Sequence, residues 1–352
     1  MDLGERSSER AAGRRPWVRR GLFFVAYSGL AVLVARTVDI HKFLAALGSL
    51  RFWTVVEVLA LVAFHLAARS LRYHYLVAKA HPVGYRVRDG VRIFLAGLAV
   101  SLVTPARAGD LLKVELTRGY GIRRAVSLGI VVVERILDLL VITATVVVAG
   151  TLLSQQWQNR GMRWAAGILL AGLLAGTVLL TVRTLRWRTI ELFAHTVARF
   201  TTRISSERVT DMCHRIFDVW DEVFASPAVA FRYFLGSSLL WLADFSKLWL
   251  LLRCTGADVS LLCVLFVYPL SLIIGILSFL PFSDGVVGVT VVALLGGLAG
   301  VSVNAATAAI LVDRGVSTLI PVLLYAAISA LRASPWARSA PAPVRANVSE
   351  TS

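Results

Sequence analysis

Leu102-Val-Thr-Pro-Ala-Arg-Ala-Gly-Asp-Leu-Leu-Lys113, followed by Val131-Val-Val-Glu-Arg-Ile-Leu-Asp138, is the part of the sequence that decides the fold. Both stretches place charged side chains inside or beside apolar runs that are otherwise typical of membrane segments. A charge near the bilayer centre costs about 2.5–3.5 kcal/mol even on the mildest insertion scales, so such residues occur mainly where they pair or line a polar pathway. The two stretches therefore indicate a membrane protein with a polar interior.

The composition of the whole chain agrees with this class. Hydrophobic residues make up 57% of the 352 residues and charged residues only 16%, and the mean hydropathy is +0.73. Such a chain has too little polar surface for a soluble globular protein. The net charge of +16 is concentrated at the two ends and in one internal block, which is typical of topology determinants and argues against a nucleic-acid partner.

Seven apolar runs are long enough to cross about 30 Å of hydrocarbon as helices, for which about 20 residues are needed. They cover residues 21–38, 53–78, 125–152, 163–183, 230–253, 260–281 and 304–331. Two further runs, 91–117 and 285–301, are preceded or interrupted by Pro and Gly, which favours re-entrant or broken helices. We predict an all-α transmembrane bundle of about eight spans, with 285–301 as a broken but complete span.

The positions of Lys and Arg predict the orientation and the domain limits. Basic residues fill the N-terminal segment 1–20, the region from Arg69 to Arg92 and the block from Arg183 to Arg215. If all three are inside, the N-terminus is cytoplasmic, and an even number of crossings returns the disordered tail 332–352 to the same side of the cell membrane. The membrane domain is then 21–331. Within it, apolar residues at helical spacing predict cytoplasmic amphipathic helices at 185–227.

Two segments share a Pro-x-x-x-Gly pattern after an apolar run. They are Pro105-Ala-Arg-Ala-Gly109 and Pro281-Phe-Ser-Asp-Gly285, the second followed by Gly288. Pro removes a backbone donor and Gly permits unusual dihedral angles, so both segments should break a helix. Corresponding breaks in two halves point to inverted-repeat pseudo-symmetry and to a transporter site near the membrane midplane.

Ionisable residues with helical spacing surround these breaks. Glu134 and Asp138 are four residues apart and share a helix face, with Arg135 beside them. Each pair alone could be an internal salt bridge, but four clusters in one bundle predict a hydrated or amphiphile-lined path, where Arg and Lys suit a phosphate headgroup. The predicted headgroup and path residues are Arg107, Asp110, Lys113, Glu134, Arg135, Asp138, Asp244, Lys247, Asp313 and Arg314.

Motifs of hydrolases, metalloproteases and nucleotide-binding enzymes do not occur in the sequence. We therefore expect no catalytic residue, cofactor or metal, and membrane lipids as the partners. Two alternatives stay open. One is a lipid-linked transferase that works through Asp110 and Glu134, and the other is a non-catalytic subunit of a lipid-modifying enzyme. A homo-oligomer is also compatible with the sequence.

The chain resembles the transmembrane region of lysylphosphatidylglycerol synthetase, a family of flippase-like membrane domains, over about residues 20–332. The family pattern Pro-x-Arg-x-Gly-Glu, with a basic residue a few positions on and a later Glu-Arg-x-x-Asp, has Asp110 in place of its Glu. The other matches are Pro105, Arg107, Gly109, Lys113, Glu134, Arg135 and Asp138. In the second family motif Gly285 and Gly288 are kept, whereas its Glu is apolar or Thr290 here, and Arg314 takes the place of the closing arginine.

The resemblance implies an activity as well as a fold. Members typically move an anionic or modified phospholipid, or a lipid-linked molecule, between the leaflets of a membrane. The resemblance does not imply aminoacyl transfer, because in the fused relatives that chemistry belongs to a soluble C-terminal domain.

Overall fold

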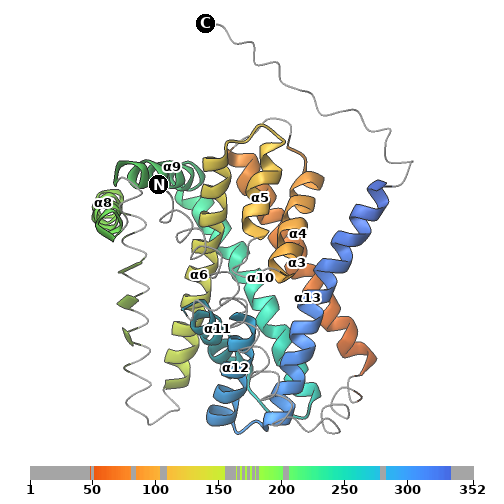
Figure 1. Ribbon diagram of the computed structural model, residues 1–352. Helices are drawn as coiled ribbons and strands as arrows, with labels where there is room; N and C mark the ends of the chain where they lie inside the picture. Colours follow the sequence, from red (N-terminus) through yellow and green to blue (C-terminus); the bar gives the residue numbers. More distant parts are fainter. Residues whose placement is uncertain are drawn as a thin grey trace, which may run out of the picture. The chain divides into compact units, whose positions relative to one another are not determined.

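Helices form almost all of the described protein. The structure, a computed structural model, describes residues 51–80, 85–103, 109–154, 182–200, 206–277 and 283–333, residue 48 and some positions between 164 and 179. These residues form ten helices and no strand (Figure 1). The predicted all-α membrane bundle is therefore confirmed. The N-terminal segment 1–20, the run 21–38 and most of the run 163–183 and of the tail 332–352 lie outside the described residues.

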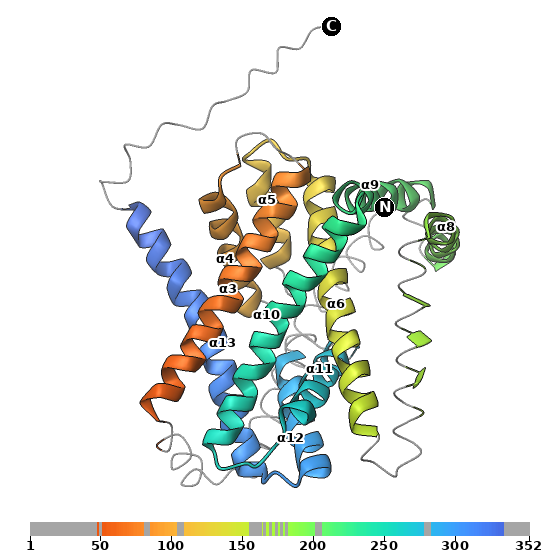
Figure 2. The same cartoon turned by 180° about the vertical axis from the view of Figure 1, so that it is seen from behind.

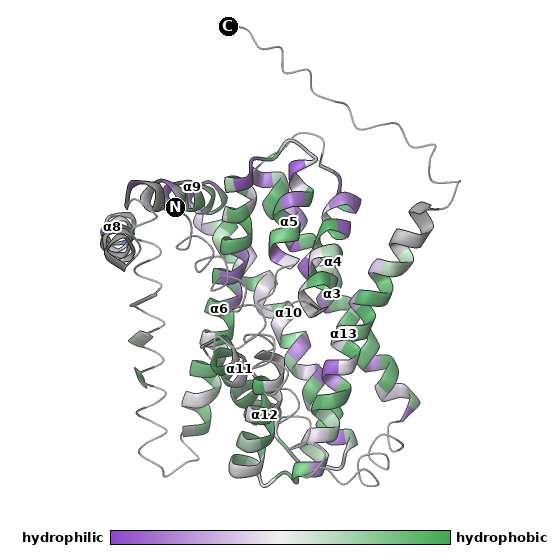
Figure 3. Cartoon of the chain, in the orientation of Figure 1, coloured by the Kyte–Doolittle hydropathy of each residue, from purple (hydrophilic) through white to green (hydrophobic). Residues whose placement is uncertain are grey.

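Four helices are long and apolar enough to cross a membrane. They are α3 (Phe52–Ala80), α6 (Arg124–Ser154), α10 (Pro227–Cys254) and α13 (Val303–Ala333). Their apolar portions contain 25 to 30 residues, and about 20 are sufficient. The predicted runs 53–78, 125–152, 230–253 and 304–331 are thus confirmed as helices of membrane length. In Figure 3 a purple band interrupts the otherwise mostly green α6, where its charged residues lie.

The predicted broken element 91–117 consists of two short helices, α4 (Val87–Val103) and α5 (Gly109–Arg118). They lie side by side in both views (Figures 1 and 2). Their backbones meet closely, because a Cβ atom built on Gly109 would be 1.8 Å from the carbonyl oxygen of Gly97. Only glycine permits this approach. Pro105 and Arg107, in the connection between the two helices, lie outside the described residues.

A second pair of short helices consists of α11 (Leu261–Leu277) and α12 (Ser283–Ala299), which pack against each other. Each has 17 residues and is therefore about 25 Å long, less than the ~30 Å of hydrocarbon. In the run predicted to span at 260–281, the structure describes the apolar helix α11 as far as Leu277. The helix ends at Leu277, and Pro281, which disfavours helical conformation in the residue before it, lies outside the described residues.

The prediction that the run 285–301 is broken at Gly285 and Gly288 is wrong. Gly285 and Gly288 lie inside α12, which is continuous from Ser283 to Ala299. Glycine in a helix interior costs about 1 kcal/mol relative to alanine, but here packing favours it. A Cβ atom on Gly288 would lie 3.3 Å from Cγ2 of Ile310, so the missing side chain lets α12 approach α13.

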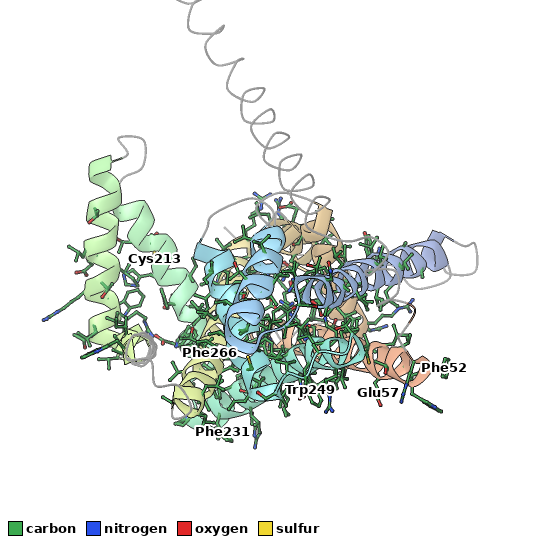
Figure 4. All side chains as sticks on the ribbon, turned by 90° about the horizontal axis from the view of Figure 1, so that it is seen from below. Phe52, Glu57, Cys213, Phe231, Trp249 and Phe266 are labelled. Carbon is green, nitrogen blue, oxygen red and sulfur yellow. The ribbon has the colours of Figure 1, made fainter. Side chains whose placement is uncertain are left out.

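The region predicted as amphipathic helices at 185–227 contains α8 (Arg183–Phe200) and α9 (Ser206–Val223). The Arg186 guanidinium on α8 contacts the Asp221 carboxylate on α9 at 2.6 and 2.8 Å. Val219 packs where Gly129 of α6 has no side chain, with its Cγ2 2.9 Å from the position that a Cβ would take. Figure 4 shows Cys213 on α9. The cytoplasmic location of these helices remains a prediction.

The chain divides into two compact units, which we describe separately. The Lys113 unit comprises residues 63–138, 178–240 and 315–352, and the Lys247 unit comprises residues 1–62, 139–177 and 241–314. Each of the four long helices supplies residues to both units. Buried aromatic and aliphatic side chains fill each unit, and each also buries a cluster of charged groups.

Candidate functional site

Lys113 lies at the centre of the charged cluster in the Lys113 unit. Its Nζ is 2.9 Å from Oδ1 of Asp110, one turn earlier on α5, and 3.0 Å from Oε2 of Glu134 on α6. The rings of Tyr73 on α3 and Phe94 on α4 flank the same ammonium group at 5.2 and 5.3 Å. Only 2% of the Lys113 side chain is exposed. One cation therefore joins four helices through two ion pairs and two cation–π contacts.

Arg72 on α3 holds the other side of Glu134. Its guanidinium donates to Asp138 Oδ1 at 2.7 Å, to Glu134 Oε1 at 3.4 Å and to the Ser237 hydroxyl at 2.7 Å. The side chain is buried, although the sequence placed Arg69 and Arg72 among the basic topology determinants. That interpretation is corrected: both lie within α3 and take part in ion pairs. Their position inside the apolar run 53–78 and their spacing of one helical turn were the signals that could have revealed this role.

The most exposed members of the cluster form its rim. Arg135 on α6 donates to Asp110 Oδ2 at 2.6 and 3.1 Å, and 33% of its side chain is exposed. Arg69 reaches Asp138 Oδ2 from a greater distance, 3.5 Å, with 12% of its side chain exposed. Asp110 is 18% exposed, whereas Asp138 is 6% and Glu134 is 0% exposed. The rim therefore presents two guanidinium groups and the Asp110 carboxylate, and the other two carboxylates lie beneath it.

We name this set the Lys113 cluster and define it as Arg69, Arg72, Asp110, Lys113, Glu134, Arg135 and Asp138. It contains four cations and three carboxylates, which leaves a surplus of one positive charge among the described residues. Buried charges are tolerated when they are paired and hydrogen-bonded. The three carboxylates of this set meet that condition, since each contacts at least two cations. The structure thus brings together every described site residue that the first family motif and its following Glu-Arg-x-x-Asp predicted.

The Lys247 unit contains a smaller cluster built on α10, α11 and α13. Lys247 Nζ is 2.9 Å from Asp244 Oδ1 and 3.0 Å from Asp313 Oδ1. Tyr268 donates to Asp313 Oδ2 at 3.0 Å and accepts a hydrogen bond from Arg314. Sequence reasoning paired Asp244 with Lys247 but missed Tyr268, because an isolated tyrosine in an apolar run carries no charge signal. Two cations balance two carboxylates here, and Asp313 is fully buried.

Possible metal ligands are not grouped together among the described residues. Among them, no group of three or more His, Cys, Asp or Glu side chains is placed to hold a metal ion. What the Lys113 cluster can do chemically is bind charge: its rim guanidinium groups can donate paired hydrogen bonds to an anion.

Apolar helices of membrane length and buried ion-pair clusters define the class: a multi-pass helical membrane protein with a charged interior. The chain matches the family model described as the lysylphosphatidylglycerol synthase TM region over residues 21–324. It therefore belongs to this family. No curated protein matches the chain with significance.

Proposed function

We propose that this protein is a membrane lipid translocase, which moves an anionic or modified phospholipid, or a lipid-linked molecule, between leaflets. The Lys113 cluster is the observation that carries the proposal. A headgroup that enters hydrocarbon loses its water, and the loss is costly unless other polar groups replace the water. A partly exposed set of ionic groups held by apolar helices supplies such replacements.

The distribution of exposure within the cluster supports a binding role over a purely structural one. Buried salt bridges contribute little net stability, because desolvation offsets their attraction. In the Lys113 cluster the Asp110–Arg135 pair is partly exposed, with 18% and 33% of the two side chains exposed. Asp110 accepts from Arg135 while also contacting Lys113, so a headgroup can exchange with it at the rim.

The test is leaflet exchange of acyl-labelled phospholipids in vesicles that contain the purified protein. Asp110→Asn keeps the shape of the side chain but removes the charge that holds Arg135 and Lys113. We expect wild-type protein to accelerate exchange over protein-free vesicles and Asp110→Asn to slow it at least tenfold. The matched control is Glu115→Gln on the same helix, an exposed carboxylate paired with Arg124 and Arg118, which should leave exchange unchanged.

The exchange rates of the variants can be compared with that of the wild type when each variant inserts and elutes as the wild type does. Wild-type exchange no faster than in protein-free vesicles contradicts the translocase proposal. Equal slowing by both variants contradicts the assignment of the site to the Lys113 cluster, because Glu115 lies outside it.

The orientation is also proposed: both termini on the cytoplasmic side of the cell membrane, with α8 and α9 at that surface. Basic residues in short flanking segments support it. A cysteine-accessibility scan in intact cells should find α8 and α9 protected from a membrane-impermeant reagent, and labelling there from outside contradicts the proposed orientation.

A further inference from the structure

Helix α9 crosses α6 close to one end of that membrane-length helix. In Figures 1 and 2, α9 runs sideways to the upright α6, and α8 is seen almost end-on. The contact is at Gly129, the sixth residue of α6, which is ~7.5 Å along the axis from the helix start. With 31 residues, α6 is ~46 Å long, about 16 Å more than the hydrocarbon requires. A centred span leaves about 8 Å at each end among the headgroups, so α9 contacts α6 at headgroup depth.

Contacts on one face hold α8 against α9. Arg186 pairs with Asp221 at 2.6 Å, and Trp187 stacks on His214 with ring centroids 3.8 Å apart. These contacts fix α8 beside α9, so α8 shares its depth. The sequence agrees, because the apolar run 163–183, which is a predicted span, leads directly into α8. Packing and chain connection therefore both place α8 at the membrane surface.

A second face of α8 is exposed and carries no charge. Residues at alternating spacings of three and four share this face, and all are exposed: Val182, Leu185, Thr189, Leu192 and Thr196. We call these five residues the α8 stripe. Its three aliphatic side chains are 42%, 40% and 70% exposed. Scattered exposed leucines are ordinary, but an uncharged line along a helix at headgroup depth fits the apolar boundary of a leaflet.

The charged side chains of the two helices lie away from the α8 stripe. Arg188 and Glu191 are exposed on α8 but fall outside the stripe. On α9, the exposed carboxylates of Glu207, Asp218 and Glu222 share one helix face by their spacing. Carboxylates are repelled by anionic headgroups, whereas an uncharged stripe can enter the acyl chains. The charge pattern therefore selects α8, and not α9, as the helix that contacts lipid.

We propose that α8 is an interfacial helix whose stripe is seated among the acyl chains of one leaflet, while α9 keeps its carboxylates in water. The partner is a lipid surface, because the stripe continues from a predicted span and lies at headgroup depth. Helices of this kind enter the boundary by about 5–10 Å. The inference requires neither the translocase function nor a particular side of the membrane. Through α9, the seated helix anchors the end of α6, which supplies Glu134 to the Lys113 cluster.

Bimane attached to single cysteines of the full chain reports which side chains reach lipid. In a background whose three cysteines are replaced by alanine, the labelled variants are Leu185→Cys and Leu192→Cys in the stripe, and Arg188→Cys and Glu191→Cys outside it. The purified proteins are reconstituted in phosphatidylcholine vesicles whose acyl chains carry bromine, a contact quencher, near the headgroup. We expect the stripe labels to lose about half or more of their emission, because the stripe lies at that depth. The labels outside the stripe should lose little.

Two further measurements complete the test. Iodide, a quencher confined to water, should quench the labels outside the stripe and spare those within it. Leu192→Glu places a charge in the stripe, where hydrocarbon disfavours it, so a label at Thr189→Cys should lose most of its quenching by brominated lipid. Thr184→Glu, at an exposed position of α8 outside the stripe, is the matched control and should leave that quenching unchanged.

Three results overturn the proposal. Stripe labels that iodide quenches as strongly as the outside labels would place the stripe in water. Stripe labels spared by both quenchers would mean that protein covers them, either a second copy or another segment of this chain. Equal effects of Leu192→Glu and Thr184→Glu would mean that the stripe does not seat the helix. None of these measurements uses leaflet exchange, so the outcome is separate from that of the translocase proposal.

Discussion

Replacing Glu134 by Gln removes a charge from a side chain that is fully buried between Lys113 and Arg72, at 3.0 and 3.4 Å. Removing one partner of a buried ion pair costs about 3–5 kcal/mol, because the other charge stays buried without compensation. Glu134→Gln raises the surplus of the Lys113 cluster to two positive charges. Lys113→Met instead leaves three cations with three carboxylates. We therefore expect Glu134→Gln to lower the free energy of unfolding by more than Lys113→Met does.

The assay is reversible unfolding of the purified protein in mixed micelles as the fraction of denaturing detergent rises. Wild type, both single variants and the double variant make a double-mutant cycle. Since Lys113 and Glu134 are in direct contact, the double variant should lose less stability than the two single losses together, by about 1–3 kcal/mol. Glu115→Gln is the exposed control and should change the unfolding midpoint far less.

Two results would refute this reasoning. Additive single effects would mean that the contact between Lys113 and Glu134 contributes no coupling. A greater loss for Lys113→Met than for Glu134→Gln would mean that the excess positive charge of the cluster is not the controlling quantity, and that the packing of the lysine between two rings is.

Three further predictions follow from individual sites. Gly109→Ala should lower the thermal midpoint sharply, since its Cβ would overlap the carbonyl oxygen of Gly97, whereas Gly236→Ala, in open space within α10, should raise stability by about 1 kcal/mol. Lys247→Met leaves two carboxylates without their shared cation and should cost about 3–5 kcal/mol in the same unfolding assay. Burial raises the pKa of the Cys213 thiol, so in a variant without other cysteines its alkylation rate should rise over a higher pH range than that of a matching peptide. A coincident pH profile would contradict this last prediction.

The long apolar helices were predictable because the hydropathy of one segment, summed over its own residues, already indicates whether the segment can cross a membrane. The runs at 53–78 and 125–152 therefore appear as α3 and α6. The ends of the short helices were not predictable in the same way. The apolar run continues past Leu277 to Leu280, so hydropathy alone does not place the end of α11 at Leu277.

Ion pairs between neighbours in sequence were predictable for a related reason. Asp110 and Lys113, like Asp244 and Lys247, are one helical turn apart, so a regular helix alone brings them together. Arg72 was assigned to a topology signal because its partner, Asp138, is 66 residues away. Nothing local distinguishes an arginine that faces water from one that meets a carboxylate of another helix.

The sequence by itself determined that this is a helical membrane protein with charges in its apolar helices, because transfer into a bilayer depends on residues summed over one segment at a time. Only the tertiary structure decided which charges meet. The packing of α3, α5 and α6 in the Lys113 unit buries Glu134 and leaves Arg69 and Arg135 at the rim. The energy of an ion pair depends on the distance between the helices that carry its two charges. That distance is set by packing between segments that are far apart in the sequence.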